Sequence, residues 1–247
     1  VVEIELVNYF IKGNIALTKV DEDYPDNKLS GAVFEVYSDT NGDEKLDKDD
    51  TLLGEMKELD GGVYQMSELR YGKYLVKETK APTGFVLDEN VYSVSVEENG
   101  KTYTVENKAG VGFINAAQKG SLKIVKTSSD GKVEGFSFRV TGVDYDQTFK
   151  TDKNGEIVIE GLRIGDYTVS EVSDKASAGY ILPADKQATV KVDATAIVQM
   201  HNEFRDTPKT GDDFNLGLWV SLAALSVVGA GVLGFVGYKN RKKKKED

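Results

Sequence analysis

Lys12-Gly-Asn-Ile-Ala-Leu-Thr-Lys19 occurs a second time, slightly changed, as Lys119-Gly-Ser-Leu-Lys-Ile-Val-Lys126. In both segments apolar residues alternate with polar ones, which is the period of a β-strand that buries one face. Similar short alternating runs, separated by clusters of Gly, Asn and Asp, fill most of residues 1–206. The pattern predicts an all-β fold.

The repeat extends well beyond its first strand. Three later pairs of segments also match, namely Leu29–Phe34 with Val133–Phe138, Tyr74–Glu78 with Tyr167–Glu171, and Val111–Asn115 with Val198–Asn202. Repeats of this kind predict two complete tandem domains, residues 12–118 and 119–206. Because Asn8 precedes Lys12-Gly13 as Asn115 precedes Lys119-Gly120, residues 1–11 are interpreted as the last strand of a truncated preceding copy.

Each copy directs three polar residues toward its own core. Residues i, i+2 and i+4 of a strand share one face, so Lys19 faces inward with Leu17, and Lys126 does so with Ile124. The same count turns four more residues inward, namely Glu78, Asn115, Glu171 and Asn202. Since an unpaired buried charge is very unfavourable, these groups must pair or change their protonation state.

Two interpretations of these groups are open from the residues alone. One is a buried Lys–Glu ion pair with Asn as a hydrogen-bond partner. The other is a reaction: burial leaves Lys as a neutral, nucleophilic amine and keeps Glu78 or Glu171 protonated, so that the acid polarises the Asn carboxamide. The amine then attacks the amide carbon and ammonia leaves, which forms an isopeptide bond.

The copies resemble Cna B-type domains of Gram-positive adhesins and pilins. Tyr74-Leu-Val-Lys-Glu78-Thr-Lys-Ala81-Pro82-Thr-Gly84-Phe85 is close to that family's E-box, which in the second copy is reduced to Tyr167-Thr-Val-Ser-Glu171-Val. The resemblance implies Ig-like or prealbumin-like β-sandwiches and spontaneous Lys19–Asn115 and Lys126–Asn202 bonds. Asn107 is a rival acceptor for Lys19, but Asn115 alone repeats the spacing seen at Asn8.

Composition excludes several function classes. The net charge of −10 is carried by residues ahead of a basic C-terminus, which argues against a nucleic-acid partner. The chain has no Cys and a single His, His201, so neither cysteine nor Ser-His catalysis is expected. His201 is next to Asn202 and should face outward. The chain is not expected to be an enzyme, and isopeptide formation requires no cofactor.

The C-terminal segment predicts a membrane anchor. An apolar run from Phe214 to Tyr238 contains no charged residue and is long enough to span a bilayer as a helix. The basic tail at 239–247 predicts that this end lies in the cytoplasm, which places the preceding domains outside the cell.

Residues 207–213 suggest a further processing step. Thr207-Pro208-Lys209-Thr210-Gly211 resembles the sortase sorting signal, usually Leu-Pro-x-Thr-Gly, with Thr207 in place of Leu. The resemblance implies cleavage between Thr210 and Gly211 and transfer of the Thr210 carbonyl to an amine of peptidoglycan or of another pilin. Such a signal requires export, so the sequence is expected to be the C-terminal part of a longer, cell-wall-anchored protein. The alternative to a sorting signal is a plain single-pass membrane protein with a Pro/Gly linker.

A loop within the first copy has the spacing of a calcium site. Its oxygen ligands would occupy positions 1, 3, 5, 9 and 12, with a backbone carbonyl at position 7, and resemble EF-hand and dockerin loops. The residues concerned are Asp39, Asn41, Asp43, Lys45, Asp47 and Asp50. The alternative interpretation is a solvated acidic hairpin loop without metal.

Three functions are compatible with the sequence. The first is a structural stalk of a wall-anchored surface protein or pilin, braced by isopeptide bonds, that holds an N-terminal part away from the cell, where that part contacts a host ligand. The second is an adhesin whose Cna B-type domains bind host protein or glycan directly. The third is the stalk of a surface enzyme whose catalytic domain lies upstream.

Overall fold

A computed structural model describes residues 8–205, and the regular secondary structure in that range consists of strands. Within that range there is no helix able to cross a membrane. Residues 1–7, the Thr207–Gly211 pentapeptide and the apolar run 214–238 lie outside the described residues.

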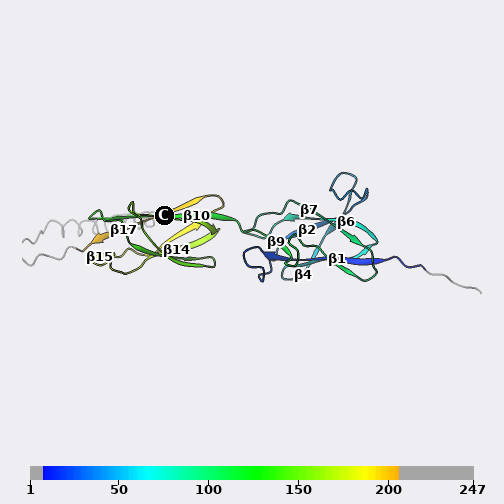
Figure 1. Cartoon of the computed structure of the whole chain (residues 1–247), viewed down its shortest axis with the longest axis horizontal. Helices are drawn as coiled ribbons and strands as arrows, with labels where there is room; N and C mark the ends of the chain where they lie inside the picture. Colours follow the sequence, from blue (N-terminus) through cyan, green and yellow to red (C-terminus); the bar gives the residue numbers. More distant parts are fainter. Residues whose placement is uncertain (1–7, 206–247) are drawn as a thin grey trace, which may run out of the picture. The chain divides into compact units, whose positions relative to one another are not determined.

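The first sandwich consists of nine strands in two sheets (Figure 1). One sheet has the order β4-β5-β1-β8, with β9 also paired to β1, and the other has the order β3-β2-β6-β7. The strands are β1 (Lys12–Asp21), β2 (Val33–Ser38), β3 (Thr51–Glu55), β4 (Lys57–Asp60), β5 (Val63–Arg70), β6 (Gly72–Lys80), β7 (Val91–Val96), β8 (Thr102–Thr104) and β9 (Phe113–Asn115).

The second sandwich repeats this plan with eight strands. Its sheets have the orders β13-β10-β17-β15 and β12-β11-β14-β16. The strands are β10 (Lys119–Ser128), β11 (Ser137–Gly142), β12 (Tyr145–Lys150), β13 (Glu156–Arg163), β14 (Gly165–Glu171), β15 (Tyr180–Ile181), β16 (Lys186–Val190) and β17 (Thr195–Phe204). The prediction of an all-β chain with two tandem sandwiches is therefore confirmed for the described part of the chain.

The cores form where the alternating pattern predicts them. In β1 the residues facing the core are buried and the residues between them are only partly covered, and β10 shows the same alternation. The first core contains an aromatic cluster in which Phe34 packs edge-on against Tyr64 and Phe113, at centroid distances of 5.2 and 4.9 Å. Contacts of this kind add to the stabilisation from apolar burial.

The two sandwiches differ at their last strand. In the second, β17 runs parallel to β10 and pairs with it continuously from Ser121 to Ser128. In the first, this partner strand is split: β8 pairs with Asn14–Ala16 and β9 pairs with Lys19–Asp21, while residues 105–112 leave the sheet between them. The first sandwich must therefore hold its last strand with a much shorter ladder.

Candidate functional site

The first site lies between the two sheets of the first sandwich. Lys19 and Asn115 extend from the neighbouring parallel strands β1 and β9, where Lys19 is paired with Phe113 and Asn115 with Asp21. Glu78 comes from β6 in the facing sheet, where it is paired with Phe34. All three side chains are buried, with exposures of 0%, 3% and 0% for Lys19, Asn115 and Glu78.

Asn115 and Glu78 are in direct contact, and Lys19 binds the backbone beside them. The Asn115 Nδ2 donates to Oε1 and Oε2 of Glu78, at 2.9 Å each. The Lys19 Nζ donates to the Phe113 carbonyl at 3.0 Å, two residues before Asn115. The Asn115 Oδ1 is buried and has no hydrogen-bond partner among the described residues. An acceptor left unpaired in a core is unfavourable and marks a position where a proton donor is missing.

The second site has the same plan. Lys126 on β10 lies opposite Met200 of β17, and Asn202 lies opposite Ser128, which is the register seen in the first sandwich. Glu171 on β14 is paired with Phe138. The Asn202 Nδ2 donates to Glu171 Oε1 at 2.6 Å, while Asn202 Oδ1 and Glu171 Oε2 are buried without partners in the described part of the chain.

Burial shifts the protonation of both pairs in the direction that favours a neutral amine and a neutral acid. It lowers the pKa of Lys19 to about 8, against opposing effects of Glu78, Asp88 and Asp21. It also lowers the pKa of Lys126. Burial raises the pKa of Glu78 and that of Glu171, although the hydrogen bond from the Asn carboxamide opposes the shift in each case.

An aromatic ring lies beside each amine, but it comes from a different strand position in the two sandwiches. The Lys19 Nζ is 5.3 Å from the centroid of Phe113 on β9. The Lys126 Nζ is 4.2 Å from the centroid of Phe136, which precedes β11, and it also donates to the Thr127 carbonyl at 2.5 Å. These rings exclude water from the amines.

Asn107, considered above as a rival acceptor, is engaged elsewhere. Its Oδ1 accepts from the Ile114 backbone N–H at 2.6 Å, and its Nδ2 donates to the Ile114 carbonyl at 2.9 Å and to Asp88 Oδ2 at 2.8 Å. Its carboxamide therefore binds the backbone of β9, and Asn115 is the carboxamide that contacts Glu78. Asp88 was not anticipated from the sequence.

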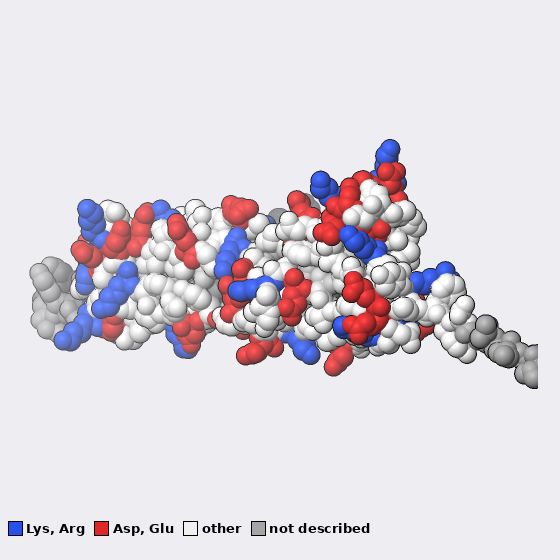
Figure 2. All heavy atoms as spheres, turned by 45° about the vertical axis from the view of Figure 1, so that its right-hand side comes forward, with Lys and Arg blue, Asp and Glu red and all other residues white. Residues whose placement is uncertain are grey.

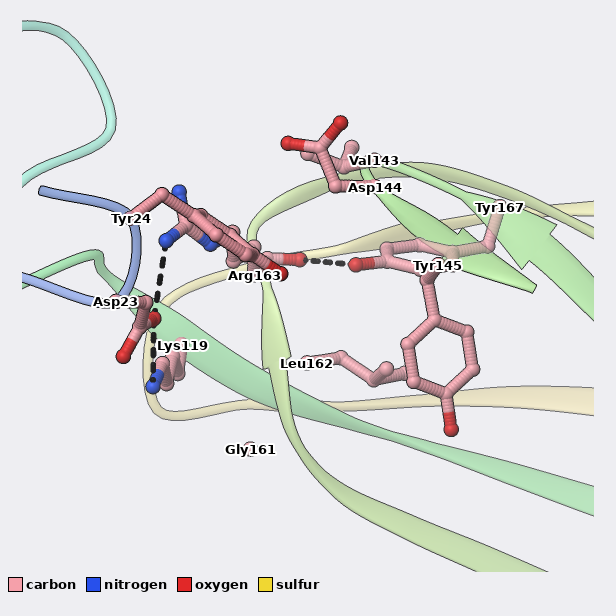
Figure 3. Close-up of a pocket in the computed structure, with 10 residues that line it drawn as sticks. All are labelled: Asp23, Tyr24, Lys119, Val143, Asp144, Tyr145, Gly161, Leu162, Arg163 and Tyr167. Atoms are coloured by element: carbon pink, nitrogen blue, oxygen red, sulfur yellow. Dashed lines mark hydrogen bonds and ion pairs between the residues drawn. The ribbon is translucent and has the colours of Figure 1, made fainter. Parts of the chain in front are cut away.

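The end of β1 beside the first site also contacts the second sandwich. Arg163 donates to both carboxylate oxygens of Asp21, at 2.6 and 2.8 Å, and to Asp23 at 3.0 Å. Figure 3 shows Arg163 and Lys119 converging on Asp23 in a small hollow, with Tyr24 over the guanidinium. Burial opposes ionisation of Asp21, but the bonds from Arg163 keep its pKa below the usual value.

The loop with calcium-site spacing connects β2 to β3. Its side-chain oxygens accept hydrogen bonds from the backbone of the loop itself, as Asp39 does from Gly42 at 2.7 Å and from Glu44 at 3.2 Å. Within residues 8–205 no group of three or more acidic, His or Cys side chains is placed to hold a metal ion. Calcium binding at Asp39, Asn41, Asp43, Lys45, Asp47 and Asp50 stays a prediction.

His201 faces outward, as predicted. It lies on β17 with an exposed side chain, and its ring contacts Thr127 and Glu203 at the surface. It is therefore separated from the buried cluster around Asn202.

Comparison with known proteins matches both sandwiches to one family model. The model of the SpaA prealbumin-like fold domain matches residues 13–109 and again 120–204. The chain belongs to the SpaA prealbumin-like domain family. The sequence prediction of Cna B-type, SpaA-like domains is thereby confirmed.

Several solved structures are similar to this chain. The Bacillus anthracis TIE protein has 25% sequence identity and a TM-score of 0.58, over 78% of this chain and 34% of that one. GBS52, the minor pilin of Streptococcus agalactiae, has 16% identity, a TM-score of 0.36 and coverages of 81% and 100%. The shaft pilin SpaA from Lactobacillus rhamnosus GG has 14% identity, a TM-score of 0.34 and coverages of 78% and 98%. Among curated proteins, none matches the chain. The chain thus spans about a third of the TIE protein's length.

Proposed function

We propose that the two sandwiches form a load-bearing stalk of a cell-surface protein and that each closes its own Lys–Asn isopeptide bond. The observation that carries the proposal is the duplication of one arrangement. Lys and Asn lie on adjacent parallel strands, with the Asn opposite the residue two positions after the Lys, and a Glu from the facing sheet contacts the carboxamide. Two copies with limited sequence similarity keep this cluster despite the unfavourable burial of its groups.

The chemistry follows from the protonation states that burial favours. The neutral Lys19 Nζ attacks Asn115 Cγ, while Glu78, with the carboxamide turned over so that Oδ1 faces it, gives its proton to that unpartnered oxygen. Glu78 next takes a proton from Nζ and passes it to Nδ2, which leaves as ammonia. The carboxylate then recovers the hydroxyl proton, so amine plus carboxamide yields isopeptide plus ammonia. Contact between fixed groups supplies most of the rate enhancement.

The position of the bonds explains how a stalk would carry load. The chain enters the first sandwich along β1 and leaves it after β9, and these strands run parallel. A Lys19–Asn115 bond would transfer tension directly between them and leave residues 20–114 unloaded. A Lys126–Asn202 bond would protect residues 127–201 in the same way, because β10 and β17 have the same arrangement.

The proposed stalk is attached through its C-terminus. The sorting signal, with cleavage between Thr210 and Gly211 by a sortase, would transfer the chain to an amine of the wall or of a pilin. The membrane span 214–238 would hold the precursor until then. The surface agrees with a spacer role: on the face drawn in Figure 2, acidic and basic side chains of the described residues are interspersed over both sandwiches.

Intact-mass spectrometry tests the proposal. The purified chain should weigh less than its sequence mass by two ammonia molecules. Glu78→Ala should restore one ammonia, Glu171→Ala should restore the other, and the double variant should have the full mass. A full mass in freshly folded wild-type protein would contradict the proposal, since the buried amines and carboxamides would then be unreacted.

A further inference from the structure

The split last strand of the first sandwich creates a problem that the second does not have. Asn202 lies within β17, which pairs with β10 on one side and, through Glu203 and Phe204, with β15 on the other. Asn115 ends β9, a strand with the bounds Phe113–Asn115 whose strand-to-strand ladder is formed with β1. The residues after it are held by an isolated Phe85–Ala117 bridge, as Phe204 is held by β15, so the difference lies in the residues before Asn115. A short edge strand frays readily, because few backbone hydrogen bonds hold it.

Asn107 occupies the place of the missing neighbour. It belongs to the segment 105–112 that interrupts the strand, for which β17 has no counterpart. Its carboxamide accepts from the Ile114 N–H at 2.6 Å and donates to the Ile114 carbonyl at 2.9 Å. Both backbone groups of the residue next to Asn115 are therefore paired as a neighbouring strand would pair them.

Asp88 connects this support to the catalytic acid. Its carboxylate accepts from Asn107 Nδ2 at 2.8 Å and from the Tyr92 hydroxyl at 2.7 Å. Its backbone N–H donates to Glu78 Oε2 at 2.8 Å. One chain of hydrogen bonds thus runs from Glu78 through Asp88 and Asn107 to β9, and it closes at the direct contact between Asn115 and Glu78.

We propose that Asn107, anchored by Asp88, is a positioning residue that holds β9 so that the Asn115 carboxamide stays in front of Lys19 and Glu78. The inference rests on the proposed function and adds a residue that acts in the first sandwich alone. The second sandwich obtains the same placement from its continuous ladder. Loss of Asn107 should therefore slow the first bond by roughly 10- to 100-fold, because small displacements of reacting atoms have effects of that size.

The test measures the rate at each site in one chain. The 247-residue chain is made by cell-free synthesis with detergent, quenched in acidic urea at timed intervals and digested, and each branched peptide is quantified. Asn107→Ala should slow the Lys19–Asn115 bond and leave the Lys126–Asn202 bond unchanged. Asn107→Asp keeps the side-chain volume and the acceptor for the Ile114 N–H, but it sets a carboxylate oxygen against Asp88 and the Ile114 carbonyl. It should therefore slow the first bond at least as much as alanine does, and it remains informative if the alanine variant folds poorly.

Tyr74→Phe is the matched control for general destabilisation. It removes one hydrogen bond of the first sandwich, from the Tyr74 hydroxyl to the Arg70 carbonyl at 2.6 Å, which closes the turn between β5 and β6, whereas Asn107→Ala removes three. It should leave both rates unchanged.

The pH profile is a second readout: the charges facing Lys19 are those of Asp21 on β1, Glu78 on β6 and Asp88 in the following loop, and Asn107→Ala removes none of them. The first-site rate of Asn107→Ala should therefore depend on pH as the wild-type rate does, but be lower at every pH.

The outcomes separate the two proposals. Wild-type protein that forms neither bond would refute the proposed function itself. Normal bonds in the wild type together with an unchanged first-site rate in Asn107→Ala would refute the positioning role and leave the function intact. Equal slowing by Asn107→Ala and Tyr74→Phe would also overturn it, because general loss of stability would then explain the effect.

Discussion

The two sandwiches place the same three side chains at the same strand positions, yet they support them differently. In the first, a short β9 is held by Asn107, and Glu78 Oε2 accepts the Asp88 N–H. In the second, a long β17 is held by a continuous ladder with β10, and Glu171 Oε2 has no donor among the described residues. The Lys–Glu–Asn geometry therefore depends on strand register, while the surrounding support differs between the copies.

Stretching single molecules should reveal the largest consequence. With both bonds formed, neither residues 20–114 nor residues 127–201 can extend. Glu78→Gln should release the first segment alone and lengthen the unfolded chain by on the order of 300 Å, at about 3.3–3.6 Å per residue. Glu171→Gln should release the second by a somewhat smaller length. Full extension of both segments in wild-type protein would show that the strands are not covalently joined.

Equilibrium unfolding compares the two closures. Joining positions 19 and 115, or 126 and 202, closes loops of similar length, so loss of either bond should lower the free energy of unfolding of its sandwich by about 4–5 kcal/mol. Glu78→Gln and Glu171→Gln keep the side-chain volume and suit this comparison by urea titration. A loss well below 1 kcal/mol in both variants would argue against covalent closure.

The glycines of the repeated Lys-Gly pair sharpen the comparison further. A Cβ added at Gly120 would lie 2.1 Å from the Lys191 carbonyl oxygen, whereas at Gly13 it would lie 2.8 Å from that of Lys101. Both alanine variants should be destabilised by about 1–3 kcal/mol through overpacking, with Gly120→Ala the worse of the two. Thermal melting measures the difference, and the reverse order would show that the 191–194 turn yields more easily than the 98–101 turn.

The pH dependence of bond formation should be bell-shaped at both sites. The reactive Lys–Glu pair carries one proton, held by the acid, so gain of a second proton or loss of the first stops the reaction. The last proton leaves the pair when Lys19 titrates beside ionised Glu78, and burial lowers the pKa of Lys19 to about 8. Above that pH neither group retains the proton that the acid step needs, so the first-site rate should decline by about tenfold per pH unit. Timed digests across pH 5–10 measure it. A rate that keeps rising to pH 10 would exclude the acid role of Glu78.

Much of this structure was predictable because strands alternate strictly. The period of two placed Lys19, Glu78 and Asn115 on inner faces, and the repeat at Lys126, Glu171 and Asn202 made the assignment consistent between copies. The strand register and the facing sheet are tertiary features. In the structure each Asn contacts its Glu across the core, and each Lys lies on the strand next to its Asn. The bonds themselves remain a proposal.

What the sequence did not reveal is the support around the first site. Asp88 and Asn107 lie in irregular segments, where no period indicates which way a side chain points. From the sequence, Asn107 is only a rival acceptor for Lys19. The signal that could have identified its role is the segment 105–112, which is present only in the first copy. At the same place the second copy has a single uninterrupted strand, β17.

Peptide mapping of the wild-type chain tests the central claim most directly. The account predicts two branched peptides, one joining Lys19 to Asn115 and one joining Lys126 to Asn202, each lighter by one ammonia than its separate parts. Unbranched peptides that carry a free ε-amino group at Lys19 and Lys126 would contradict it.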